Sequence, residues 1–162
     1  MILHARTKSV EQTRELGRAL GGLVREGDII LLAGDLGAGK TALTQGLGTA
    51  LAIDEHITSP TFTIARSYEG RVRLHHLDVY RLEHLQEAID LGLAELVDDD
   101  AVAVIEWGDA VVPALPREFL EVRLQFGEAD DDRVVDVHPV GGRWAARSDA
   151  LLRALEPWTE TP

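Results

Sequence analysis

Eight consecutive residues in the first third of the chain match the phosphate-binding pattern G-x-x-x-x-G-K-[ST]. They are Gly34, Asp35, Leu36, Gly37, Ala38, Gly39, Lys40 and Thr41. The glycines of this pattern let the backbone curl so that several N–H groups point at phosphate oxygens. The ammonium group of the lysine reaches the terminal phosphates, and the threonine hydroxyl is a ligand for Mg²⁺. The segment therefore predicts a loop that binds the triphosphate of ATP together with Mg²⁺.

Two elements must position this loop, one before it and one after it. Residues 28–33 form a short and mostly apolar run, which is typical of a strand buried on both faces of a parallel sheet. Residues 40–51 predict a helix, whose N-terminus adds partial positive charge at the phosphates. The alternative is a glycine-rich turn that matches by accident. The strand before the loop and the helix after it favour the functional interpretation.

Two carboxylates are candidates for the magnesium shell and for orienting water. Residues 101–105 are an apolar run that ends in Glu106, and Asp78 ends another expected strand. A phosphate loop of this class requires an acid at the end of a neighbouring strand. The alternative for either residue is a solvated carboxylate at a strand end. The apolar run favours function for Glu106, whereas these residues alone leave both readings of Asp78 open.

The rest of the chain predicts further helices and strands. Ser9 begins a helix, with Gln12 at capping-box spacing. The other expected elements are a hairpin over 61–68 and 72–78, a helix over 83–89, strands over 119–126 and 134–137, and a closing helix carrying Trp144, Leu151 and Leu155. This order indicates an α/β fold with a parallel core and antiparallel additions. We expect a single domain over residues 1–162.

Other polar residues carry weaker signals. His75 and His76 are adjacent in an expected strand, so their side chains point to opposite faces and cannot share a metal. Structural or surface roles are expected for both. Arg81 has the charge to stabilise a phosphate, although a surface ion pair is the commoner role of an arginine. The acidic runs at 98–100 and 130–132 lack calcium-loop spacing and are expected to be solvated loops.

Composition restricts the class of protein. The 162 residues are 45% hydrophobic, which is enough for a core, and the absence of cysteine excludes disulfides and thiolate metal sites. The formal net charge of −12 disfavours a direct grip on a nucleic-acid backbone. There is no signal-peptide pattern and no apolar run long enough to cross a bilayer. A cytoplasmic protein without a membrane partner is therefore expected.

Four motifs make the sequence more specific than a general phosphate-loop protein. GDLGAGKT at 34–41, SPTFT at 59–63, HLDVYRL at 76–82 and IEWG at 105–108 occur in this order. Together they closely resemble the TsaE (YjeE) family, which comprises bacterial ATPases required for the threonylcarbamoyladenosine modification of tRNA. The resemblance extends over nearly the whole chain. The SPT and H-x-D-x-Y-R elements make it specific, because they are not general features of phosphate-loop proteins.

The resemblance implies a role for each matching residue. Lys40 would contact phosphate, and Thr41 would bind magnesium. The SPTF segment resembles a switch region in which Thr61 senses the terminal phosphate. Asp78 matches the acid of a second switch, which favours a functional role for it. With Glu106, which matches the acid associated with magnesium, these residues form the expected catalytic and metal-binding set.

The resemblance also implies a fold and partners. Trp107 lies in the family's I-E-W element near the nucleotide. The family fold is an α/β domain of the P-loop NTPase type, a mixed sheet flanked by helices. Its members act with two partner subunits, TsaB and TsaD, of which TsaD performs the transfer onto tRNA. The chain would therefore contact tRNA only indirectly, and no DNA partner is expected.

Two other functions use the same loop and stay open. A small-molecule kinase would need an acceptor pocket and usually an arginine-bearing lid, for which the sequence shows no clear segment. A switch module would bind ATP and change its partner affinity without significant hydrolysis. Phosphate transfer to an acceptor would identify the first, and nucleotide-dependent partner binding without phosphate release would identify the second.

Overall fold

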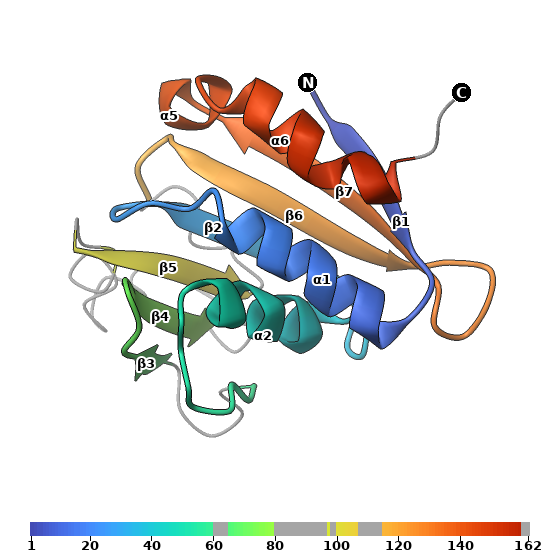
Figure 1. The fold of residues 1–162 in the computed structure, drawn as a ribbon, viewed down its shortest axis with the longest axis horizontal. Helices are drawn as coiled ribbons and strands as arrows, with labels where there is room; N and C mark the ends of the chain where they lie inside the picture. The colour runs from blue at the N-terminus through green and yellow to red at the C-terminus, as the bar shows by residue number, and fades with distance from the viewer. Residues whose placement is uncertain (60–64, 80–96, 98–99, 107–114, 160–162) are drawn as a thin grey trace.

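The structure is a computed structural model of the chain and describes residues 1–59, 65–79, 97, 100–106 and 115–159. The strands are β1 (Leu3–Thr7), β2 (Ile29–Ala33), β3 (Ala65–Tyr68), β4 (Arg73–Asp78), β5 (Ala101–Glu106), β6 (Phe119–Phe126) and β7 (Arg133–Val140). The helices are α1 (Val10–Gly21), α2 (Lys40–Ala50), α5 (Gly142–Ala145) and α6 (Ser148–Leu155), followed by the 3₁₀ helix η3 (Glu156–Trp158). Figure 1 shows α1, α2 and α6 lying across one face of the sheet.

The strands named above form one mixed sheet in the order β1-β7-β6-β2-β5-β4-β3. The four central strands, β6, β2, β5 and β4, run parallel to one another. Antiparallel strands complete both sides, with β7 and β1 on one side and β3 on the other. The predicted α/β class, with a parallel core and antiparallel additions, is therefore confirmed.

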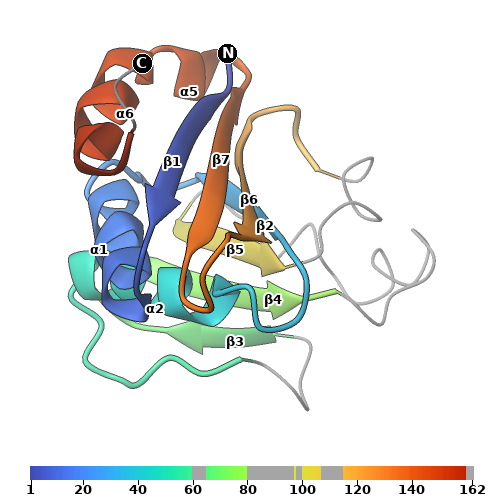
Figure 2. The ribbon, with the colours of Figure 1, turned by 90° about the vertical axis from the view of Figure 1, so that its right-hand side faces the viewer.

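Register brings the ends of several strands to one edge of the sheet. Leu32 of β2 and Asp78 of β4 both pair with Glu106 of β5, so three parallel strands end at the same level. On the other side of β2, Thr7 and Phe126 both pair with Arg133. Figure 2 views the molecule from this carboxyl edge. The phosphate loop that follows β2 thus lies between two groups of strand ends.

Helix α2, which follows the phosphate loop, is fixed by close packing on α1. The Ser9 side chain caps α1 by accepting a hydrogen bond from the Gln12 N–H, as the sequence predicts. A Cβ on Gly17 would lie 2.1 Å from the Leu43 carbonyl oxygen, and one on Gly46 would lie 1.8 Å from that of Arg14. Only glycine permits this approach, which holds the start of α2 against α1.

Apolar side chains cover both faces of the sheet, which explains the continuous apolar runs in β2 and β5. On β2, Ile30 and Leu32 join the larger core under α1, α2 and α6. Ile29 and Leu31 join the smaller core on the opposite face, which also contains Ile105. The central strands are therefore held from both sides, and their carboxyl ends form a rigid platform.

The structure corrects two expectations about the elements. Strand β1 was not predicted, although Leu3, Ala5 and Thr7 are buried in alternation along it. The single closing helix is wrong, because α5 and α6 are separate helices and Arg147 between them turns its side chain inward to Asp28. The expected hairpin is confirmed where described, as β3 and β4. Residues 61–64 of that hairpin and the expected helix over 83–89 lie outside the described residues.

Candidate nucleotide-binding site

The loop between β2 and α2 has the backbone of a phosphate cradle. Gly37 and Gly39 adopt φ values of +84° and +107°, a region that side chains rarely enter. A Cβ on Gly34 would lie 2.7 Å from the Leu124 carbonyl oxygen, so β6 closes the loop from outside. The Leu36 side chain at the loop tip is 92% exposed. The loop therefore curls around open space at the N-terminus of α2.

Lys40 opens α2 and is only 7% exposed. Its Nζ donates hydrogen bonds to the carbonyl oxygens of Gly34, at 2.6 Å, and Asp35, at 3.3 Å. Burial lowers the pKa of Lys40 below its ordinary value, while the carboxylates of Glu106, Asp78 and Asp35 act in the opposite direction. A buried ammonium group of this kind gains strongly from a polyphosphate, whose charge offsets the desolvation.

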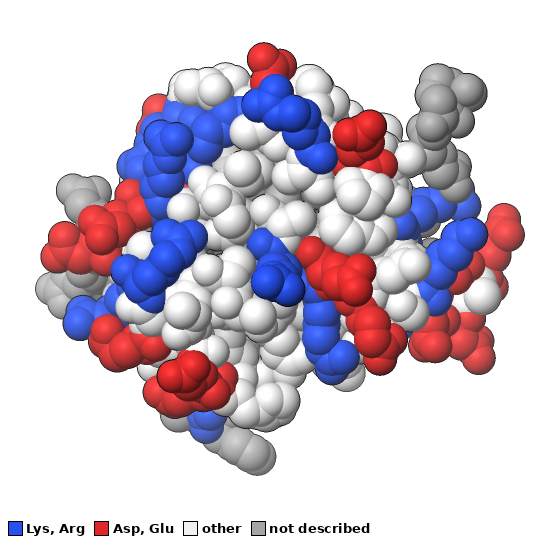
Figure 3. Space-filling view, viewed as in Figure 1, with Lys and Arg blue, Asp and Glu red and all other residues white. Residues whose placement is uncertain are grey.

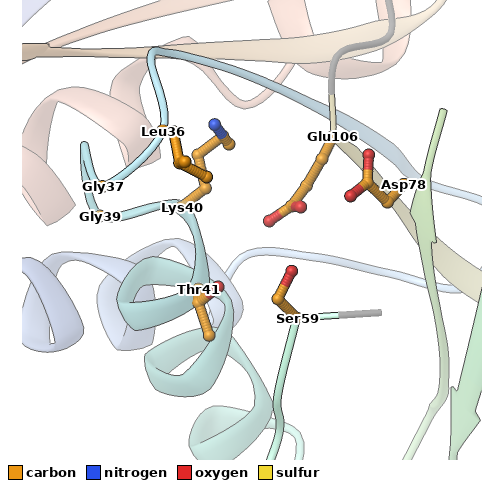
Figure 4. A pocket seen from close by; sticks show the side chains of 8 residues that line it. All are labelled: Leu36, Gly37, Gly39, Lys40, Thr41, Ser59, Asp78 and Glu106. Carbon is orange, nitrogen blue, oxygen red and sulfur yellow. The ribbon is translucent and has the colours of Figure 1, made fainter. Parts of the chain in front are cut away.

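A cavity of about 250 Å³ lies in front of this loop. It is lined by Leu36, Gly37, Gly39, Lys40, Thr41, Ser59, Asp78 and Glu106. Figure 4 shows the carboxylates of Glu106 and Asp78 on one side of the space and the loop with Lys40 and Thr41 on the other. Two hydroxyls, an ammonium group and two carboxylates thus come together from four separate segments of the chain.

Glu106 is buried with an unsatisfied oxygen. Its residue exposure is 2%, and Oε1 has no hydrogen-bond partner among the described residues. The buried His76 lies beside it, with Nε2 3.4 Å from that oxygen. Buried polar atoms are almost always hydrogen-bonded, and one left without a partner costs about 1–3 kcal/mol. A buried carboxylate with an unsatisfied oxygen, on a residue that lines a cavity, is therefore a marker of ligand or metal binding.

The donors around the cavity fit Mg²⁺ bound together with phosphate. Among the described residues, no three His, Cys, Asp or Glu side chains gather closely enough to form a metal site unaided. Magnesium does not require such a cage, because it binds through one or two protein oxygens plus water and substrate phosphates. The Thr41 hydroxyl and the orphaned Glu106 carboxylate supply that number of oxygens.

The structure gathers most of the predicted site residues. Thr41, Asp78 and Glu106 line one cavity with Lys40 and the loop. Gly34 and Asp35 contribute carbonyl oxygens to Lys40, and the Ala38 side chain is buried behind the loop. Predicted residues Thr61 and Trp107 lie outside the described residues, as does Arg81.

Two residues near the site were missed by the sequence analysis. Ser59 lines the cavity, although only Thr61 of the SPTFT motif was singled out. His76 was expected in a structural or surface role, and it lies buried beside Glu106. The alternation of strand side chains carried the signal for it, since His76 and Asp78 are two residues apart and share a face. His75 is also buried and bonds Ser67 on the opposite face, so neither histidine is a surface residue.

Within the described part of the chain, no helix has both the length and the apolar character needed to span a membrane.

Known proteins resemble this chain over most of its length. The family model of the threonylcarbamoyl adenosine biosynthesis protein TsaE matches residues 7–135. The tRNA threonylcarbamoyladenosine biosynthesis protein TsaE of Streptomyces coelicolor is 44% identical over 146 residues, which cover 86% of this chain and 98% of the relative. The protein of the same name from Treponema pallidum is 42% identical over 131 residues, which cover 81% of this chain and 96% of the relative.

A solved structure shares the fold. The crystal structure of YdiB from Bacillus subtilis matches with a TM-score of 0.79 at 33% sequence identity, covering 94% of this chain and 95% of that one. The mixed, helix-flanked sheet with its phosphate loop is therefore an architecture that this chain shares with known relatives.

Proposed function

The chain belongs to the TsaE family, and from that premise we propose that it is a Mg²⁺-dependent ATPase serving the N6-threonylcarbamoyladenosine modification of tRNA. One observation carries the ATPase part of the proposal. The buried Lys40 ammonium group and the orphaned Glu106 carboxylate line the same cavity at the phosphate loop. A triphosphate is matched to the Lys40 ammonium group and a divalent cation to the Glu106 carboxylate, so the two ligands together suit the cavity.

Each residue has a defined task in ATP binding. Backbone N–H groups of residues 36–41 and the α2 N-terminus receive the phosphate oxygens. Lys40 exchanges its bonds to the Gly34 and Asp35 carbonyls for the terminal phosphates. Thr41 and Glu106 would hold Mg²⁺, which would supply charge compensation at the phosphates. The cradle is formed before the ligand arrives, so little reorganisation is needed.

Hydrolysis transfers the γ-phosphoryl group to water and leaves ADP and inorganic phosphate. Asp78 ends β4 next to Glu106 and lines the cavity, where it is placed to orient the attacking water. Thr61 is proposed to sense the γ-phosphate and to couple its loss to movement of the switch segment. Trp107 is proposed to contact the nucleotide from the segment that follows Glu106.

The proposed partners are TsaB and TsaD, and we propose that this chain acts with them in the cytoplasm. It would contact tRNA only indirectly. The net charge of −12 supports an indirect role, because direct tRNA binding depends on phosphate neutralisation by Lys and Arg. On the face shown in Figure 3, basic and acidic side chains are interspersed. That face offers no single-signed basic surface of the kind that grips a polyanion.

Two experiments test the proposal. ATP hydrolysis is measured for the chain alone and with TsaB and TsaD, beside modification of tRNA. Hydrolysis that rises with the partners, together with tRNA modification that requires this chain, is the expected result. Release of inorganic phosphate separates hydrolysis from a kinase, which would transfer phosphate to an acceptor, and from a switch module, which would bind ATP without release. Failure to bind ATP would contradict all three functions.

A further inference from the structure

Arg133, the first residue of β7, is hydrogen-bonded to the backbone of the phosphate loop. Its Nε donates to the Ala38 carbonyl oxygen at 3.0 Å, and its Nη2 donates to the Gly37 carbonyl oxygen at 3.3 Å. Figure 2 shows the turn between β6 and β7 beside the loop that follows β2. Of the described residues, those that line the nucleotide cavity do not include Arg133. The arginine therefore contacts the loop from outside that cavity.

The guanidinium group of Arg133 is itself held in place by the turn that precedes it. Its Nη1 donates to the carbonyl oxygens of Asp130, at 2.7 Å, and Asp132, at 2.8 Å. Its Cζ lies 4.8 Å from the centre of the Phe126 ring, which is a cation–π contact. All three guanidinium nitrogens thus donate to backbone carbonyls. Because the guanidinium fork is planar and rigid, the turn between β6 and β7 determines where the loop carbonyls lie.

These bonds orient two peptide groups of the phosphate loop. A peptide group is planar and trans, so its C=O and its N–H point in opposite directions. Since the Ala38 carbonyl is directed at Arg133, the Gly39 N–H points the other way, and Gly39 lines the nucleotide cavity. The Gly37 carbonyl shares its peptide group with the Ala38 N–H, which donates to the Asp35 carbonyl oxygen at 3.0 Å. Arg133 therefore fixes the direction of N–H donors in the segment proposed to bind phosphate.

The loop needs such a restraint because its backbone is otherwise free to rotate. Gly37 and Gly39, with positive φ values, flank Ala38, and glycine reaches alternative conformations at little steric cost. A Cβ on Gly37 would meet no atom of the described chain within 4 Å, so packing does not restrain this residue. The bonds from Lys40 reach carbonyls nearer the start of the loop, and they are exchanged when phosphate binds in the function proposed above. The bonds from Arg133 do not compete with phosphate in this way.

We propose that Arg133 is a positioning residue, which orients the phosphate-binding N–H groups of the loop through the carbonyls of Gly37 and Ala38. The proposal rests on the ATP-binding function proposed above and adds to it a residue that lies outside the four sequence motifs. Donors that are oriented before the ligand arrives lose less conformational freedom on binding, so they bind more tightly. Loss of Arg133 should therefore loosen the loop in the free protein and weaken its hold on Mg-ATP.

The first test measures the loop in the nucleotide-free protein. Amide hydrogen exchange, followed by NMR, reports how often the Ala38 N–H leaves its bond to the Asp35 carbonyl. In Arg133→Met, exchange at Ala38 should be about tenfold faster, whereas exchange at Leu51, the reference at the far end of α2, should change less than about twofold. Phe126→Leu removes the ring beside the guanidinium group from an exposed position and should accelerate exchange at Ala38 by a smaller factor.

The second test measures Mg-ATP affinity by isothermal titration calorimetry. Arg133→Met should bind Mg-ATP about tenfold more weakly than the wild type. Arg133→Lys keeps the positive charge and loses the fork that reaches two carbonyls at once, so it should remain at least about threefold weaker. The control is Arg123→Met, which removes an arginine of β6 that pairs with Glu121, and it should bind like the wild type.

Several results would overturn the positioning role of Arg133. One is unchanged exchange at Ala38 in both Arg133→Met and Phe126→Leu. Another is equal acceleration at Ala38 and Leu51, which would report a loss of stability of the whole fold. Unchanged ATP affinity in Arg133→Met would also overturn it, as would wild-type affinity in Arg133→Lys, since positive charge alone would then suffice. A wild-type protein that binds no Mg-ATP would instead overturn the ATP-binding function, while the exchange rates still test the restraint of the loop.

Discussion

Two buried acids at opposite edges of the sheet have opposite surroundings. Asp28 precedes β2, and Glu106 ends the neighbouring parallel strand β5; each is 2% exposed. Asp28 accepts two hydrogen bonds from the Arg147 guanidinium, at 2.6 and 2.8 Å, and another from the Arg25 N–H at 2.6 Å. Glu106 leaves Oε1 without a hydrogen bond in the described structure.

The difference favours a structural role for Asp28 and the proposed ligand-binding role for Glu106. The carboxylate of Asp28 is hydrogen-bonded by other groups of the protein itself. Its partner Arg147 also stacks on Trp144, with Cζ 3.8 Å from the ring centre. This pairing docks the C-terminal helices against the start of β2. Glu106 instead opens onto the cavity of the phosphate loop. We therefore expect mutation of Asp28 to lower the stability of the fold. Mutation of residues around the phosphate-loop cavity should instead change the binding or hydrolysis of ATP.

The largest effect is expected for Asp28→Ala. Removing the acid leaves Arg147 buried without its partner, so the free energy of unfolding should fall by about 3–5 kcal/mol. Urea unfolding measures the change, and ATP affinity per folded molecule should stay within about twofold. The double variant Asp28→Leu/Arg147→Met removes both charges and should be less destabilised than the single variant. A fall of less than about 1 kcal/mol in the free energy of unfolding of Asp28→Ala would contradict the structural role of Asp28.

At the other edge, Lys40→Met should weaken Mg-ATP binding by about a thousandfold, because the terminal phosphates lose their buried cation. Its free energy of unfolding should be unchanged or higher, since a desolvated charge is removed. Calorimetric titration and urea unfolding give the two quantities. Arg73→Met, which removes an exposed cation outside the site, is the control and should bind ATP normally. ATP affinity like that of the wild type in Lys40→Met would refute the site.

Glu106→Gln should lower the rate of ATP hydrolysis about a hundredfold, because the amide is a poor ligand for Mg²⁺ and does not offset its charge. The folded state should tolerate the change, since a carboxylate oxygen without a hydrogen bond becomes part of a neutral group. Glu121→Gln on β6 is the matched control, a half-buried acid paired with Arg123 outside the cavity. A strong loss of stability in Glu106→Gln with normal ATP hydrolysis would show that Glu106 has a structural role.

The smallest effect is expected for His76, which touches Glu106 and does not line the cavity. As a positioning residue, its loss in His76→Leu should raise the Mg²⁺ concentration for half-maximal hydrolysis about tenfold. His76→Gln restores a nitrogen at similar reach and should recover most of that shift. Hydrolysis measured across a Mg²⁺ series reports the change. An unshifted Mg²⁺ requirement in His76→Leu would show that His76 only fills space.

Local patterns predicted the elements whose signals lie within a few residues. The phosphate loop, its flanking strand and helix, and the Ser9 cap are encoded by neighbouring residues, and all are found as expected. The pairing of β6 with β7 followed from a clean alternation and a short connection. Strand β1 was missed because its alternation spans only five residues and its partner β7 lies more than a hundred residues away.

The site was predictable in its residue types and less so in its contacts. Glu106 and Asp78 could be identified as strand ends, but their meeting depends on β4 and β5 being neighbours in register. The hydrogen bonds from Arg133 to Gly37 and Ala38 join residues that are 96 and 95 positions apart in the sequence, and no local pattern predicts them. The Asp28–Arg147 pair was missed for the same reason, because tertiary packing alone brings its partners together.

A crystal structure with Mg²⁺ and a non-hydrolysable ATP analogue would decide whether the buried charges at the carboxyl edge are kept for a nucleotide. We expect Lys40 Nζ to leave the Gly34 and Asp35 carbonyls and to lie about 3 Å from a γ-phosphate oxygen. The metal should contact the Thr41 hydroxyl and lie on the Glu106 side of the phosphates. An analogue bound elsewhere, with Lys40 still bonded to those two carbonyls, would contradict the assignment.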